Sequence, residues 1–152
     1  MIKDEEDGLW IDLNEAIAAP AEKVFHCVTT SHGLTMWLPV AAEVDLRPGG
    51  TVTLGWDAAM DRRTTIAILD YDAGGTITWD WVVGADLHAP LYWTVEPHVE
   101  EGAHVNLRQG PWAREPESML LMAEEHANWR WQLCNLRAVL EVKFDMRRVR
   151  PL

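Results

Sequence analysis

The sequence predicts an α+β fold in which antiparallel strands precede one long C-terminal helix. In residues 76–83 large apolar side chains at the odd positions alternate with Thr76, Thr78 and Asp80 at the even ones, as in a half-buried strand. Strand-like runs between Ala41 and Gln109 are separated by turn residues, which is typical of an antiparallel sheet. From about Pro116 to about Phe144, apolar residues recur at spacings of three and four, which places them on one face of a helix.

The N-terminal part predicts a tail, a strand and two short helices. Residues 1–8 carry four acids and one Lys and are expected to be a solvated acidic tail. Residues 9–14 alternate with the period of a strand. Pro20 then suits the first turn of a helix that ends near Thr30, because its missing N–H costs nothing there. Ser31 is the expected cap of a second short helix, which Pro39 stops.

Indoles recur on the face of the strands that is expected to point inward. The runs are joined by glycine turns at 47–50 and 72–75. The expected inward residues are Val52, Leu54 and Trp56, then Ile77, Trp79, Trp81 and Val83, then Leu91, Trp93 and Val95, then Val105 and Leu107.

The C-terminal helix has one apolar stripe with a single titratable group in it. The stripe consists of Met119, Met122, His126, Trp129, Leu133, Leu136 and Leu140. Acidic residues at its start and basic residues at its end suit the helix dipole.

Length and charge restrict the function classes. A chain of 152 residues predicts one domain, which we place at 9–146 with a basic tail at 147–152. Thirteen Lys and Arg against twenty-four Asp and Glu give a net charge of -11, which disfavours nucleic acid as a partner. No apolar run is long enough for a membrane span, and the N-terminus does not read as a secretory signal. We therefore expect a cytoplasmic protein without membrane insertion.

Tryptophan is the unusual feature of the composition. Nine Trp stand against two Phe and two Tyr. An indole carries one N–H donor that needs a partner when it is buried. Either the core is built around indoles, or a cavity is lined with them.

Three segments carry a family resemblance through their order and spacing. They are IAAPAEKVFHCVTTSHGLTMWLP, DLRPGGTVTLGW and HANWRWQLCNLRAVLE. Together they resemble the Hsp90-ATPase-activator-homologue family of the START and birch-pollen-allergen superfamily, also called the SRPBCC type. The matching positions are Pro20, Val24, Phe25, Thr30, Leu34 and Trp37, then Arg47, Gly49 and Gly50, then His126, Trp129, Leu133, Leu136 and Leu140. Asn128 departs from the family, which usually has Gly before the Trp.

This resemblance implies a helix-grip fold. A curved antiparallel sheet of about seven strands would surround the C-terminal helix, with two short helices between strands one and two and a cavity between sheet and helix. The family's eukaryotic namesake is a multidomain co-chaperone, whereas other members of the superfamily bind hydrophobic small molecules. The fold alone does not choose between these functions.

We favour binding or sequestering of a hydrophobic small molecule, in particular an aromatic one, because aromatic walls with few polar groups suit a flat apolar ligand. The alternative that the rings simply fill the core has equal weight, and for His126 a satisfied, half-exposed histidine is favoured over a ligand contact. The expected ligand-binding residues are Trp37, Trp56, Trp79, Trp81, Trp93, Met122, His126, Trp129 and Leu133.

Two other functions stay open. One is a chaperone-associated interaction module of the stress response, as the family name suggests. The other is a cyclase or hydrolase with His126 or a cavity acid as base, which needs a second polar group that the strands do not offer. Because no catalytic motif or zinc spacing is present, we assign no catalytic residue, no cofactor and no metal, and we leave a homodimer open.

Overall fold

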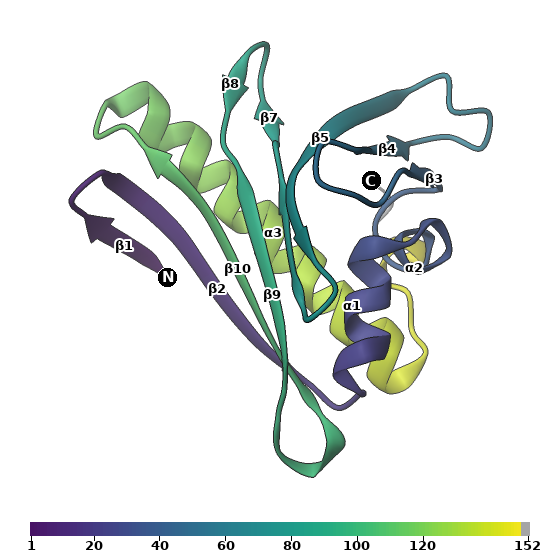
Figure 1. Cartoon of the computed structure of the whole chain (residues 1–152). Coiled ribbons are helices and arrows are strands. Elements are labelled where there is room, and N and C mark those ends of the chain that lie inside the picture. The colour runs from purple at the N-terminus through teal and green to yellow at the C-terminus, as the bar shows by residue number, and fades with distance from the viewer. Residues whose placement is uncertain (150–152) are drawn as a thin grey trace.

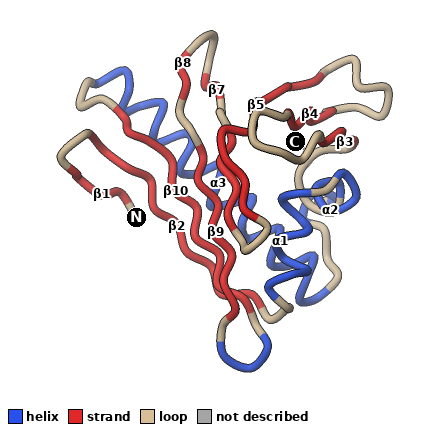
Figure 2. The backbone as a smooth tube through the Cα atoms, viewed as in Figure 1, coloured by secondary structure: helices blue, strands red, loops and turns tan. Residues whose placement is uncertain are grey.

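A long helix lies against one face of a curved antiparallel sheet in the computed structural model, which describes residues 1–149 (Figure 1). The main sheet has eight strands in the order β1-β2-β10-β9-β6-β5-β4-β3. Strands β7 and β8 form a separate ribbon at the top of the view (Figure 2). The strands are β1 (Ile2–Glu5), β2 (Gly8–Ile17), β3 (Ala41–Val44), β4 (Thr51–Gly55), β5 (Arg63–Asp72), β6 (Thr76–Trp79), β7 (Val82–Val83), β8 (Leu87–His88), β9 (Leu91–Pro97) and β10 (Ala103–Trp112). The helices are α1 (Ala21–Thr29), α2 (Ser31–Thr35) and α3 (Pro116–Val142), with short 3₁₀ turns η1 (Val99–Glu101) and η2 (Met146–Arg148).

The register of the central strands sets which side chains meet under the helix. Leu107, Trp93 and Ile77 stand opposite one another across β10, β9 and β6. The next row contains Gln109, Leu91 and Trp79. Since side chains in one row of an antiparallel sheet share a face, the expected inward positions of these strands are confirmed, and all six side chains are buried.

The two short helices lie between β2 and β3, as expected. Pro20 precedes the first residue of α1. Thr30 rather than Ser31 caps α2, because its Oγ1 accepts a hydrogen bond of 3.0 Å from the backbone N–H of Gly33. A Cβ at Gly33 would overlap the carbonyl oxygen of His26, so glycine is what permits α2 to fold back closely on α1.

The N-terminal residues form an edge strand rather than a free tail. Residues 2–5 pair with β2 in antiparallel register, which brings the main sheet to eight strands instead of about seven. Lys3 forms an ion pair with the buried Asp12. The guanidinium of Arg108 lies 2.6 Å from the Glu5 carboxylate, which ties β10 to β1. Ion pairs and backbone hydrogen bonds hold β1 in place, rather than a buried apolar face. The strand therefore lacks the alternation of apolar residues that would have predicted it from the sequence.

Helix α3 buries most of the expected stripe. Met122, Trp129, Leu133, Leu136 and Leu140 are at most 6% exposed. Met119, in contrast, is 44% exposed and His126 is half-buried. Met119 and His126 lie on the same face of the helix as Leu133 and Leu140. The rest of the fold covers this face only in its C-terminal half.

The residues that follow α3 are anchored to the body of the fold. The buried side chain of Asn135 donates to the carbonyl oxygen of Trp37 and accepts from the backbone N–H of Met146, at 2.9 and 2.7 Å. Arg147 donates to the carbonyl oxygens of Pro39 and Thr35, both at 2.8 Å. Arg147 is therefore packed rather than part of a basic tail. Residues 150–152, also assigned to that tail, lie outside the described residues.

Replacing Trp129 with Ala should lower the free energy of unfolding by about 3 to 5 kcal/mol, the usual cost of truncating a buried large aromatic side chain. Trp129 has no solvent exposure. Leu120→Ala on the same helix is the control, because Leu120 is 69% exposed and should cost about 0.5 kcal/mol or less. A denaturant titration in which Trp129→Ala loses under about 1 kcal/mol would contradict the packing of α3.

Asp12→Asn should destabilise the protein at neutral pH by about 1.5 to 3 kcal/mol, the range for hydrogen bonds to a charged group. Burial raises the pKa of Asp12, but the Lys3 ammonium and the Asn106 amide outweigh burial and hold this pKa below its usual value. A lowered pKa in the folded state stabilises the fold above the unfolded pKa, near about 4, and this contribution is lost as the pH falls through the folded pKa.

The free energies of unfolding of wild type and Asp12→Asn should therefore converge in urea titrations between pH 7 and about pH 2. The exposed Asp86→Asn is the control and should match the wild type throughout. Equal stability of Asp12→Asn and wild type at pH 7 would show that the Lys3 pair contributes nothing.

Candidate ligand-binding site

Five tryptophans form one connected set between the sheet and α3, which we call the tryptophan cluster. Its ring centroids are 5.4 Å apart for Trp79 and Trp93, 5.9 Å for Trp93 and Trp129, 5.1 Å for Trp81 and Trp129, and 6.0 Å for Trp37 and Trp93. The ring planes meet at steep angles, in the edge-to-face arrangement that aromatic quadrupoles favour.

The cluster is assembled from elements far apart in the sequence. Trp79 ends β6, Trp93 lies in β9, Trp129 lies in α3, and Trp37 follows α2. These four side chains are at most 1% exposed. Trp81, between β6 and β7, is half-buried and is where solvent reaches the cluster. The structure thus brings together five of the nine expected ligand residues.

The other four expected residues have different surroundings. Met122 and Leu133 are buried on α3 and belong to the same hydrophobic core. Trp56 is half-buried beyond β4, where its Nε1 donates to the Thr64 hydroxyl at 3.0 Å. The Nε2 atom of His126 lies 3.2 Å from the Met1 nitrogen, so this ring faces the β1–β2 edge.

Two indole donors of the cluster have no acceptor among the residues that the structure describes. Trp37 donates to the Cys27 carbonyl oxygen at 2.8 Å, and Trp129 donates to Oε2 of Glu125 at 2.9 Å. The Nε1 atoms of Trp79 and Trp93 are buried without a hydrogen-bond partner in residues 1–149. Most buried polar groups in folded proteins are hydrogen-bonded, so each exception requires an explanation.

Buried amides lie beside the indoles, and the sequence analysis missed them. Gln109 and Gln132 are at most 2% exposed, and neither Oε1 has a partner within the described part of the chain. Gln109 continues the inward phase of Val105 and Leu107, which is the signal that could have identified it. The expectation that the strands offer no polar group to the site is therefore wrong at Gln109.

Glu125 is the second group that the sequence analysis missed. It lies three residues after Met122 and four before Trp129, on the buried side of α3. Its Oε2 accepts hydrogen bonds from Gln109 Nε2 at 3.1 Å and from Trp129 Nε1. Burial raises the pKa of Glu125 above its usual value, although the hydrogen bonds from Gln109 and Trp129 act in the opposite direction.

A pocket of about 320 Å³ lies between the β7–β8 ribbon and the start of α3. Leu87, Ala89, Trp112 and Leu121 supply apolar walls. The carbonyl oxygen of Ala89 accepts a hydrogen bond of 3.2 Å from Gln109 Nε2. Gln109 is therefore in contact with a wall of the pocket.

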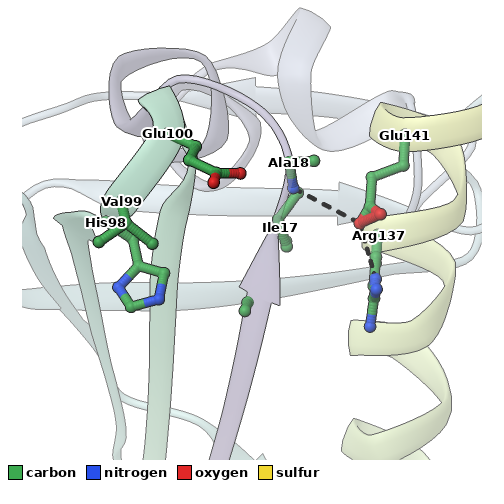
Figure 3. A pocket seen from close by; sticks show the side chains of 9 residues that line it. Ile17, Ala18, His98, Val99, Glu100, Arg137 and Glu141 are labelled. Atoms are coloured by element: carbon green, nitrogen blue, oxygen red, sulfur yellow. Dashed lines mark hydrogen bonds and ion pairs between the residues drawn. The ribbon is translucent and has the colours of Figure 1, made fainter.

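A second pocket, of about 260 Å³, lies at the other end of α3 (Figure 3). It is lined by the end of β2, the β9–β10 loop and two residues of the helix, Arg137 and Glu141. Arg137 donates to Glu141 at 2.6 Å, and the backbone N–H of Ala18 donates to the same oxygen at 3.5 Å. No residue expected to bind a ligand lies in its wall.

Neither cysteine forms a disulfide; Cys27 is buried and Cys134 is exposed. Burial raises the pKa of the Cys27 thiol to about 11. Within residues 1–149, no three His, Cys, Asp or Glu side chains gather as metal ligands would. No helix in that range is both long enough and apolar enough to cross a membrane.

Solved structures with the same fold come from several bacteria. The Aha1 dimer from Colwellia psychrerythraea has a TM-score of 0.72 at 20% identity, covering 88% of this chain and 96% of that one. SSP2350 from Staphylococcus saprophyticus has a TM-score of 0.72 at 19% identity, over 90% and 96% of the two chains. CalU16 from Micromonospora echinospora has a TM-score of 0.70 at 17% identity, over 97% and 86%. At these identities the likeness shows the helix-grip fold alone.

Sequence comparison gives the family. No curated protein matches this chain. The family model described as activator of Hsp90 ATPase homolog 1-like protein matches residues 18–141, which include β3 to β10, both short helices and most of α3. This match confirms the resemblance seen in the three sequence segments, and the chain belongs to the activator of Hsp90 ATPase homolog 1-like family.

Proposed function

We propose that the protein binds a flat, largely apolar small molecule against the tryptophan cluster. The observation that carries this proposal is the pair of unpartnered indole donors, Trp79 Nε1 and Trp93 Nε1. Phenylalanine would fill much of the same space without burying an N–H group. Two indoles with unused donors therefore fit a site that recognises a ligand better than a core that only needs volume.

The energetics favour a ligand that carries an oxygen. A buried donor left without an acceptor costs about 1 to 3 kcal/mol. A carbonyl, ether or hydroxyl oxygen placed between Trp79 and Trp93 would remove this cost. The unpartnered Oε1 atoms of Gln109 and Gln132 would accept from a ligand hydroxyl. The complementary ligand is thus an aromatic ring system with one or two polar substituents.

Access to the cluster is proposed beside Trp81. Trp81 is half-buried, packs on Trp129 and leads directly into the β7–β8 ribbon. The ribbon belongs to a separate sheet from the strands that hold Trp79 and Trp93. Movement of the ribbon would thus expose the cluster without breaking the main sheet. We place this binding in the cytoplasm, where two unpaired cysteines stay reduced.

A panel of hydrophobic aromatic compounds should change the tryptophan fluorescence of the protein in a saturable manner. Trp79→Phe and Trp93→Phe should weaken binding of oxygen-bearing compounds by about 2-fold to 12-fold, because each removes one hydrogen bond while retaining most of the ring.

Trp10→Phe is the matched control for the fluorescence experiment. Trp10 is also buried, but it contacts Tyr92 and Arg108, and its indole donates to Asp7. Binding should be unchanged in this variant.

Native mass spectrometry of the protein as purified provides a second measurement, by detecting a retained small molecule. If no compound in the panel alters emission up to its solubility, the proposal fails and the cluster is solely core.

A further inference from the structure

Glu125 is half-buried at the edge of the tryptophan cluster and has no cationic partner within residues 1–149. Asp12 pairs with Lys3, Glu15 with Arg130 and Arg137, and Asp145 with Arg147. Within residues 1–149, Glu125 forms no salt bridge with Lys, Arg or His, and its neighbour Glu124 is a like charge. Since buried charges in proteins are usually paired, this exception requires a physical explanation.

The hydrogen-bond partners of Glu125 within residues 1–149 are neutral. The Gln109 amide and the Trp129 indole both donate to Oε2, and the Trp81 indole lies within hydrogen-bond reach of the same carboxylate. These contacts fix the position of the carboxylate but do not compensate its charge. Burial accordingly raises the pKa of Glu125 despite the hydrogen bonds.

The surroundings of Glu125 suit an organic cation. Trp81 and Trp129 lie beside it with ring centroids 5.1 Å apart, and Trp129 turns its N–H edge to the carboxylate, so the two rings supply packing surface for the aromatic part of a ligand. Gln109 is fully buried, and its Oε1 is a further acceptor without a partner in the described chain.

The negative charge around the neighbouring pocket also favours a cationic ligand. Glu115 and Glu117 line the pocket that Ala89 separates from Gln109. The chain as a whole carries a net charge of -11. A negative field of this kind raises the local concentration of small cations.

We propose that Glu125 recognises a protonated amine on the ligand of the tryptophan cluster, so that the ligand class is an aromatic ring bearing an alkylammonium group. This inference rests on the proposed function and adds the charge of the ligand to it. The ammonium donates to Glu125 while the ring packs against Trp81 and Trp129. A neutral hydroxyl satisfies the same lone pairs but leaves the carboxylate uncompensated, so it binds more weakly.

The test compares two probes of the same shape, naphthylmethylamine and naphthylmethanol, by isothermal titration calorimetry at neutral pH. The wild type should bind the amine at least about tenfold more tightly than the alcohol, since a charge-assisted hydrogen bond is stronger than a neutral one. Equal affinity for the two probes would overturn the inference and leave the proposed function standing. Binding of neither probe, with no response in the fluorescence panel, would overturn both.

Two variants then locate the effect. Glu125→Gln keeps an acceptor for Trp129 and should lower affinity for the amine about tenfold while changing affinity for the alcohol by less than about twofold. Glu124→Gln removes one negative charge from the adjacent, exposed position and should change neither affinity. Near-ultraviolet circular dichroism checks that both variants are folded. An equal loss of amine binding in the two variants would assign the preference to the general field and overturn the role of Glu125.

Discussion

The packing of Trp129 against Trp93 is the contact on which the rest of the structure depends. One ring lies in α3 and the other in the centre of the sheet, with centroids 5.9 Å apart. This contact fixes the height of the helix over the sheet and the rotation of its buried face. The rotation in turn directs Glu125 towards Gln109 and places Gln132 inside. Changes at either ring would therefore affect both the core and the candidate site.

The same contact explains why stability and recognition share residues here. Indoles fill the space between sheet and helix as a hydrophobic core requires, yet each brings a donor that must be satisfied. Trp37 and Trp129 satisfy theirs with protein acceptors, whereas Trp79 and Trp93 do not within the described chain. Incomplete hydrogen bonding is expected at functional sites, where groups that recognise a ligand lower the stability of the free protein. The proposed ligand would recover part of that cost.

Charge is distributed differently at the periphery and in the interior. At the edges of the fold, carboxylates meet Lys or Arg, and these pairs hold β1, the C-terminal half of α3 and η2. Beside the tryptophan cluster, the donors that Glu125 meets in the described part of the chain are all neutral. Lys and Arg side chains thus pair with several carboxylates at the edges of the fold, but none within residues 1–149 pairs with Glu125, and the inferred ammonium of a ligand would supply that charge.

The sequence by itself determined the order of the main elements from β2 onwards, the inward phase of Trp79 and Trp93, most of the buried face of α3, and the family. Each of these depends on a period within one element, or on the spacing of motifs along the chain, which residues reveal locally. The tertiary structure decided which residues meet. The contact of Gln109 with Glu125 depends on register and helix rotation, and the outward position of His126 depends on which half of its face of α3 is covered. Strand β1 and the anchored Arg147 are held by ion pairs and backbone contacts. Such contacts join elements distant in sequence and leave no periodic signal, so only the folded chain reveals them.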